Sequence, residues 1–138
     1  MPKSRIIVVD SDESVAGVIS ALLVRLGYHV TARAPSGELA LEHAAANRPD
    51  LALIDLHLRG ELSGMATARR FVDDLELPVV SLTSMPTAAE FERAAEAGAY
   101  ACLPKPFDSR ELKREVDAAL GRGTLSLRLE RLASSGRP

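Results

Sequence analysis

Residues 49–55 read Pro-Asp-Leu-Ala-Leu-Ile-Asp, and this stretch decides the fold. A short apolar run between charged residues is typical of a β-strand that is buried on both faces. Residues 6–9, Ile-Ile-Val-Val, have the same character, as do residues 79–82, Val-Val-Ser-Leu, which follow a proline. Residues 29–32 and 100–103 are weaker strand candidates. The sequence therefore predicts five short strands.

Helical patterns lie between and after these strands. Apolar residues recur at helical spacing from residue 15 to 26, and similar stripes predict helices over residues 36–46 and 65–75. Capping-box patterns at residues 87–90 and 108–111 predict the starts of a fourth and a fifth helix. The first stripe consists of Val15, Val18, Ile19, Leu22, Leu23 and Leu26.

Strands that alternate with helices through short connections predict an α/β fold with a parallel sheet covered on both faces. Because crossovers are right-handed, few topologies remain. We expect a flavodoxin-like, doubly wound (βα)5 domain over residues 1–121, with strand order 2-1-3-4-5. Residues 122–138 differ in composition and form a C-terminal tail, either disordered or helical. A helical tail would bind a partner or a second copy of the chain, giving a homodimer.

The composition narrows the class of protein. The 138 residues suit one domain, and 46% hydrophobic residues suffice for a core. A net charge of −2 argues against a nucleic-acid footprint over the whole domain, and a single cysteine excludes an intramolecular disulfide. No apolar run approaches the length of a signal-peptide core or of a membrane span. We therefore expect a soluble, cytoplasmic protein without a membrane partner.

Polar residues that could carry chemistry follow the predicted strands. In doubly wound sheets, ligands bind beyond the carboxyl ends of the strands, so these residues should share one rim. Clustered oxygen ligands without histidine or cysteine match Mg²⁺. A purely structural ion pair between Lys105 and Asp55 is the alternative, and Asp12 could instead cap a helix. The residues concerned are Asp10, Ser11, Asp12, Asp55, Thr83, Ser84 and Lys105.

Over about residues 4–120 the sequence resembles the receiver domains of two-component response regulators. Four motifs in order carry the resemblance: Ile-Ile-Val-Val-Asp10, Pro49-Asp-Leu-Ala-Leu-Ile-Asp55, Pro78-Val-Val-Ser-Leu-Thr83 and Lys105-Pro-Phe107. The resemblance implies that Asp55 is the phosphoacceptor and that it attacks a phosphohistidine on a sensor histidine kinase or a phosphotransfer protein.

The resemblance also assigns roles to the residues around Asp55. It implies that Asp10, Asp55 and the backbone carbonyl of His57 hold Mg²⁺. Lys105 would contact a phosphoryl oxygen as a point charge, and the Thr83 hydroxyl would move to hydrogen-bond the phosphoryl group. The peptide bond before Pro106 is often cis in this family.

Two positions depart from the family pattern. Ser11 stands where a second acid is usual, so Mg²⁺ binding should be weaker unless Asp12 compensates as a metal ligand. Cys102 stands at the usual switch aromatic. By strand parity, Tyr100 should lie on the same face as Cys102 and could substitute for the aromatic. We expect signalling through the loop that follows Thr83.

The resemblance leads to one main functional hypothesis and two alternatives. We expect a stand-alone receiver without a DNA-binding domain, because the tail is too short for one, and output through protein contacts of the fourth helix, fifth strand and fifth helix. It would not be an enzyme beyond self-catalysed phosphotransfer and autodephosphorylation at Asp55. The first alternative is a degenerate receiver that acts as a phosphorylation-independent scaffold. The second is a small phosphohydrolase, which His57 disfavours because the general acid belongs there.

Overall fold

The computed structural model describes residues 2–121, in which five strands alternate with five helices. The expectations for the tail, residues 122–138, lie outside this range. The strands are β1 (Arg5–Val9), β2 (His29–Ala34), β3 (Leu51–Asp55), β4 (Val79–Thr83) and β5 (Ala101–Pro104). The helices are α1 (Glu13–Arg25), α2 (Gly37–Ala46), α3 (Gly64–Asp73), α4 (Ala88–Glu96) and α5 (Ser109–Gly121). None of these helices is long and apolar enough to cross a bilayer.

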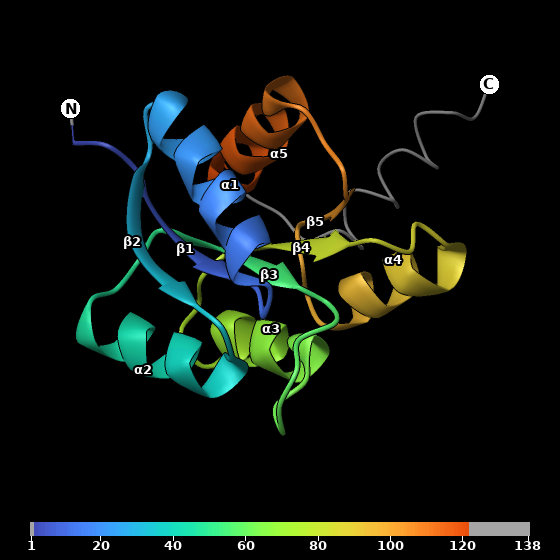
Figure 1. The fold of residues 1–138 in the computed structure, drawn as a ribbon. Coiled ribbons are helices and arrows are strands. Elements are labelled where there is room, and N and C mark those ends of the chain that lie inside the picture. Colours follow the sequence, from blue (N-terminus) through green and yellow to red (C-terminus); the bar gives the residue numbers. More distant parts are fainter. Residues whose placement is uncertain (1, 122–138) are drawn as a thin grey trace.

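The sheet confirms the predicted topology. All four strand pairings are parallel, and the strand order is β2-β1-β3-β4-β5. Helices α1 and α5 lie on one face of the sheet, and α2, α3 and α4 lie on the other (Figure 1). The strand order reverses between β1 and β3, so the carboxyl ends of these two strands flank the switch point where such folds bind ligands.

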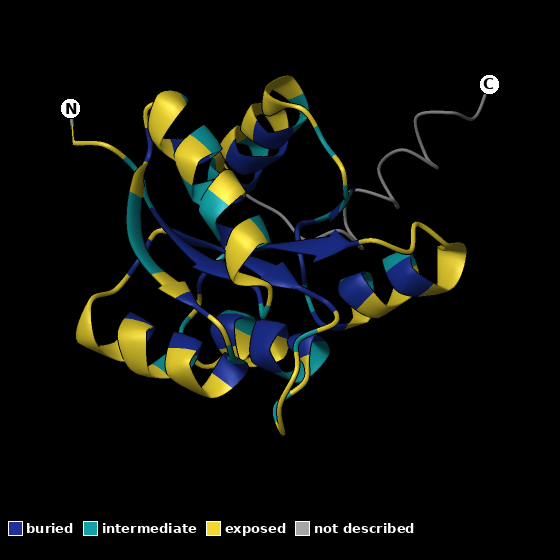
Figure 2. Ribbon diagram, in the orientation of Figure 1, coloured by how far each residue is buried: buried dark blue, intermediate teal, exposed yellow. Residues whose placement is uncertain are grey.

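Successive residues of the central strands feed two separate hydrophobic clusters. In β1, Ile6 and Val8 pack with α1 and α5, whereas Ile7 and Val9 pack with α2, α3 and α4. All five residues of β3 and all five of β4 are buried, as Figure 2 shows for the centre of the sheet. Continuous apolar runs, and not alternating patterns, are what a sheet covered on both faces requires.

One residue of the predicted α1 stripe does not face the core. The side chain of Val18 is 63% exposed, while Ala16, Ile19 and Leu23 are buried against the sheet. Val18 instead lines an apolar groove of about 500 Å³ that continues to Phe107, after β5. Helical spacing marks an apolar stripe but does not determine how much of its width the sheet covers.

Side-chain caps fix where the helices begin. Ser36 caps α2 through the backbone N–H of Leu39, as predicted. At α5 the capping box is complete, because the carboxylates of Asp108 and Glu111 each accept a hydrogen bond from the other's backbone N–H. Thr87 caps α4, but the expected reciprocal bond from Glu90 is absent; the Thr87 N–H donates to the Met85 carbonyl instead.

Candidate functional site

Two buried carboxylates and one ammonium group meet at the carboxyl end of the sheet. Asp10 directly follows β1 and Asp55 ends β3; their side chains are 1% and 10% exposed. Lys105, which follows β5, places Nζ 3.2 Å from Asp10 Oδ2 and 3.4 Å from Asp55 Oδ2. The peptide bond between Lys105 and Pro106 is cis. The topology thus assembles three predicted residues that are up to 95 positions apart in the sequence.

The other oxygen of each carboxylate is held by the backbone two residues further on. Asp10 Oδ1 accepts a hydrogen bond from the Asp12 N–H at 2.9 Å, and Asp55 Oδ1 accepts one from the His57 N–H at 3.0 Å. Such turns orient short acidic side chains without help from distant residues. Both carboxylates are therefore fixed in direction, which suits a site that acts by positioning charge.

The two residues after Asp10 serve the surrounding loops. The Ser11 hydroxyl donates to the Pro35 carbonyl at 3.0 Å and accepts from the Arg59 N–H at 2.8 Å. Asp12 Oδ1 accepts hydrogen bonds from the backbone N–H groups of Ser14 and Val15, so Asp12 is the N-cap of α1. Of the two roles considered for Asp12, the structure shows the cap.

The donor set of this pocket suits a hard cation. Asp10, Asp55 and Lys105 together carry two negative charges and one positive charge, a net charge of −1, and none of the three side chains is more than 18% exposed. Within residues 2–121, no group of three or more acidic, histidine or cysteine side chains could hold a metal by itself. Two carboxylates completed by backbone carbonyls, water and phosphate oxygens are a usual set for Mg²⁺. The residues therefore fit Mg²⁺ better than a metal that needs a full cage of side chains.

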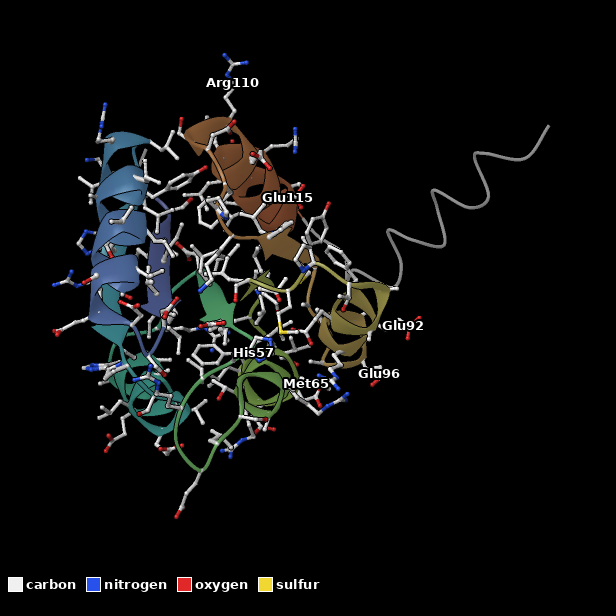
Figure 3. All side chains as sticks on the ribbon, turned by 45° about the vertical axis from the view of Figure 1, so that its right-hand side comes forward. His57, Met65, Glu92, Glu96, Arg110 and Glu115 are labelled. Atoms are coloured by element: carbon white, nitrogen blue, oxygen red, sulfur yellow. The ribbon has the colours of Figure 1, made fainter. Side chains whose placement is uncertain are left out.

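A second cluster, which the sequence did not reveal, surrounds the Thr83 hydroxyl. Thr83 ends β4 with no exposed surface, and its Oγ1 lies 3.0 Å from Glu90 Oε1. Glu90 comes from α4 with a side chain only 5% exposed, and it also accepts hydrogen bonds from His57 Nε2 and Arg93 Nη1. The His57 side chain is 43% exposed, and its Nε2 turns to Glu90. In Figure 3, Glu92 and Glu96 lie on the outer side of α4.

Glu90 stays ionised despite its burial. Desolvation raises the pKa of its carboxyl, but hydrogen bonds from His57 and Thr83, with the charges of His57 and Arg93, outweigh that effect and leave the pKa below its ordinary value. A buried carboxylate with this many donors is satisfied. The one sequence signal for Glu90 was the capping box, which pointed to a different partner.

Cys102 and Tyr100 lie on opposite faces of the sheet, so the expectation from strand parity is wrong. Tyr100 packs in the cluster of α1 and α5, whereas Cys102 packs in the cluster of α2, α3 and α4. The reason is that β5 begins at Ala101, and parity holds only within a strand. Burial, with the negative charge of Glu90, raises the pKa of the Cys102 thiol to about 12. The negative charge of Glu90 thus acts on the residue at the position that an aromatic usually occupies.

A doubly wound sheet with two buried acids and a lysine at its switch point defines a narrow class of α/β proteins. The sequence model of the response regulator receiver domain matches residues 6–117. The chain belongs to this family.

Relatives of known role agree with this assignment. The transcriptional regulatory protein CseB of Streptomyces avermitilis is 34% identical over 120 residues, which are 87% of this chain and 50% of that protein. The DNA-binding response regulator MtrA of Mycolicibacterium smegmatis is 36% identical over 120 residues, 87% of this chain and 52% of that protein. The chain spans about half the length of the curated relatives it matches.

Solved structures show the same fold. The receiver domain of a modulated diguanylate cyclase from Desulfovibrio desulfuricans G20 aligns with a TM-score of 0.81 at 31% identity, over 87% of this chain and 95% of that one. A putative response regulator from Chloroflexus aurantiacus J-10-fl gives a TM-score of 0.81 at 33% identity, over 88% and 100%.

The relatives overturn the expectation that this protein has no DNA-binding domain. That expectation used only the length of the tail, whereas the matched residues make up only 52% of MtrA, a DNA-binding response regulator. The expectation was wrong because a receiver is a module with its own core, and its sequence does not reveal what is fused to it.

Proposed function

We propose that this receiver is a phosphorylation switch in which Asp55 accepts a phosphoryl group from a phosphohistidine. The donor is a sensor histidine kinase or a phosphotransfer protein. The observation that carries the proposal is the pair of buried carboxylates, Asp10 and Asp55, that share the Lys105 ammonium group at 3.2 and 3.4 Å. One cation between two acids leaves negative charge that a second cation can neutralise.

The transfer needs positioning and charge stabilisation more than covalent chemistry by other residues. An Asp55 carboxylate oxygen attacks phosphorus, the bond from phosphorus to the donor histidine breaks, and an acyl phosphate forms. The Lys105 ammonium group lies beside the Asp55 carboxylate, which is the group that reacts. After the transfer it can bond to a phosphoryl oxygen, which then carries the negative charge. The hydrogen bond from the His57 N–H holds the Asp55 side chain in direction.

Mg²⁺ would be held by Asp10, Asp55 and the backbone carbonyl of His57, and it would neutralise charge on the transferred group. Asp10 is suited to this role because its side chain is almost fully buried and its Oδ1 is fixed by the Asp12 N–H. Output would follow through protein contacts of the surface formed by α4, β5 and α5.

Acetyl phosphate and Mg²⁺ provide the test, with intact-protein mass spectrometry of the 138-residue chain as the readout. The wild type should gain one phosphoryl group in a Mg²⁺-dependent way, and Asp55→Asn should gain none. Asp73→Asn, which changes an exposed aspartate on α3, is the matched control and should behave as the wild type. Phosphorylation of Asp55→Asn would refute the assignment.

A degenerate receiver that works as a scaffold without phosphorylation is the second candidate. It is favoured by one observation: Ser11 replaces an acid and bonds to Pro35 and Arg59, while Asp12 caps α1. No mass gain in the wild type with acetyl phosphate and Mg²⁺ would select this candidate.

A further inference from the structure

The Thr83 hydroxyl has one proton, and that proton already has an acceptor. Thr83 Oγ1 accepts from the Met85 N–H at 3.0 Å, so its own proton must go elsewhere. Two acceptors are within reach: Glu90 Oε1 at 3.0 Å and the Met85 carbonyl at 3.3 Å. The carboxylate is closer and charged, and charge-assisted hydrogen bonds are about twice as strong as neutral ones. Thr83 therefore donates to Glu90.

We infer that Glu90 is a positioning residue which holds the Thr83 hydroxyl in the unphosphorylated protein and competes for it with a phosphoryl group on Asp55. The inference rests on the proposed function. When Asp55 carries a phosphoryl group, the proton stays on Thr83 Oγ1, and its acceptor changes from Glu90 Oε1 to a phosphoryl oxygen. The Thr83–Glu90 bond thus opposes the switched state.

Glu90 can lose the Thr83 bond without being left as an unpaired buried charge. His57 Nε2 also bonds to Oε1, and Arg93 Nη1 lies 3.1 Å from Oε2. An uncompensated buried carboxylate would cost far more than the phosphoryl contact returns. Glu90 also lines a cavity of about 180 Å³, together with Leu56, His57, Ser63, Met65 and Arg93, so there is open space beside this residue.

The position of Glu90 also gives the signal a route. It sits in the first turn of α4, beside the Thr87 cap, and it contacts His57 from the loop after β3. Loss of the Thr83–Glu90 hydrogen bond therefore removes one of the contacts that fix the first turn of α4. In this chain the residue of β5 at the usual aromatic position is Cys102, so the β5 aromatic that receivers usually have there is missing.

A double-mutant cycle with beryllofluoride, which mimics the acyl phosphate, tests this inference. Beryllofluoride is titrated into the 138-residue chain at fixed Mg²⁺, and amide chemical shifts report the dissociation constant. Glu90→Ala should tighten binding about tenfold, the scale of one hydrogen bond to a charged group. In a Thr83→Val background the same substitution should change binding less than about twofold, because the competition has been removed.

The cycle separates the competing explanations. If Glu90→Ala tightens beryllofluoride binding equally with and without the Thr83 hydroxyl, Glu90 acts only through its negative charge. If Glu90→Ala does not tighten binding at all, Glu90 does not oppose the switch. Either result overturns the inference. Wild-type protein that fails to bind beryllofluoride would refute the proposed function, and the inference with it.

Two further variants guard against trivial outcomes. Glu90→Gln keeps the shape of the side chain and replaces Glu90→Ala if that variant does not fold. Its neutral amide oxygen is a weaker acceptor than the carboxylate. Glu90→Gln should therefore tighten beryllofluoride binding about threefold, again only when Thr83 is present. Glu92→Gln makes the same change on the exposed side of α4 and should leave binding unchanged. Tightening by Glu92→Gln equal to that by Glu90→Gln would overturn the inference.

Discussion

The Ser11 hydroxyl accepts a hydrogen bond from the backbone N–H of Arg59 at 2.8 Å, across 48 positions of sequence. It donates at the same time to the Pro35 carbonyl at 3.0 Å. Ser11 therefore ties the loop after β1 to the loops after β2 and β3. At the position where receivers usually have a second acid, this chain has a residue that connects three loops around the site.

Ser11→Asp should tighten Mg²⁺ binding and lower stability. A carboxylate adds an anionic oxygen beside Asp10 and Asp55, but it cannot donate to the Pro35 carbonyl and adds repulsion. We expect a loss of about 1 kcal/mol in the free energy of unfolding, the scale of one hydrogen bond. Calorimetric Mg²⁺ titration and urea denaturation measure the two effects. Ser11→Ala should lose stability without tightening Mg²⁺ binding, and unchanged affinity in Ser11→Asp would show that the pocket is built differently.

The loop after β4 should report the switched state. The Met85 N–H donates to Thr83 Oγ1, and the Met85 carbonyl accepts from the Thr87 N–H at 2.8 Å, so a moving hydroxyl disturbs this loop directly. We expect large amide chemical-shift changes over residues 84–87 when beryllofluoride and Mg²⁺ are added. Changes confined to β5, with residues 84–87 unmoved, would contradict a loop mechanism.

Gly64→Ala should destabilise the protein by about 1–3 kcal/mol, the usual cost of overpacking. A Cβ at Gly64 would lie 2.2 Å from the Asp55 carbonyl oxygen and 2.6 Å from the backbone of Leu56, so α3 would have to move away from β3. Gly17→Ala is the matched control: its new Cβ meets only the end of the Arg33 side chain, and alanine favours the α1 helix. Urea denaturation should show opposite signs, and a neutral Gly64→Ala would contradict the packing.

The contact between α5 and Tyr28, in the turn before β2, should make stability depend on pH. Burial raises the pKa of Asp117, but hydrogen bonds from the Tyr28 hydroxyl and from Lys113 at 3.0 Å outweigh it and hold the pKa below its ordinary value. A carboxyl with a depressed folded pKa stabilises the protein above its unfolded pKa, and this contribution is lost as pH falls through the folded value.

Asp117→Asn should therefore lose less stability than the wild type between pH 7 and pH 3, measured by urea denaturation at each pH. Tyr28→Phe should reduce the loss in the same direction, because it removes the first of the two hydrogen bonds. The same loss in wild type and Asp117→Asn would contradict this account.

The sequence by itself determined the sheet and three residues of the site. The apolar runs of residues 6–9, 51–54 and 79–82 are typical of strands covered on both faces, and the short connections between the elements allow few topologies. Since parallel strands end at one edge, residues that follow the strands had to converge there, as Asp10, Asp55 and Lys105 do. Local pattern and global fold agree at these positions.

Only the tertiary structure decided which partners the remaining polar residues take. Glu90 matches a capping box with Thr87, yet its carboxylate turns inward. There it accepts hydrogen bonds from Thr83, His57 and Arg93, which together stabilise it more than the single Thr87 N–H would. From the sequence, Asp12 could have been a metal ligand or a helix cap. The sequence around Ser11 did not predict its hydrogen bonds to Pro35 and Arg59. A hydrogen bond depends on which groups lie within about 3 Å, and for residues far apart in sequence only the packed fold sets that distance.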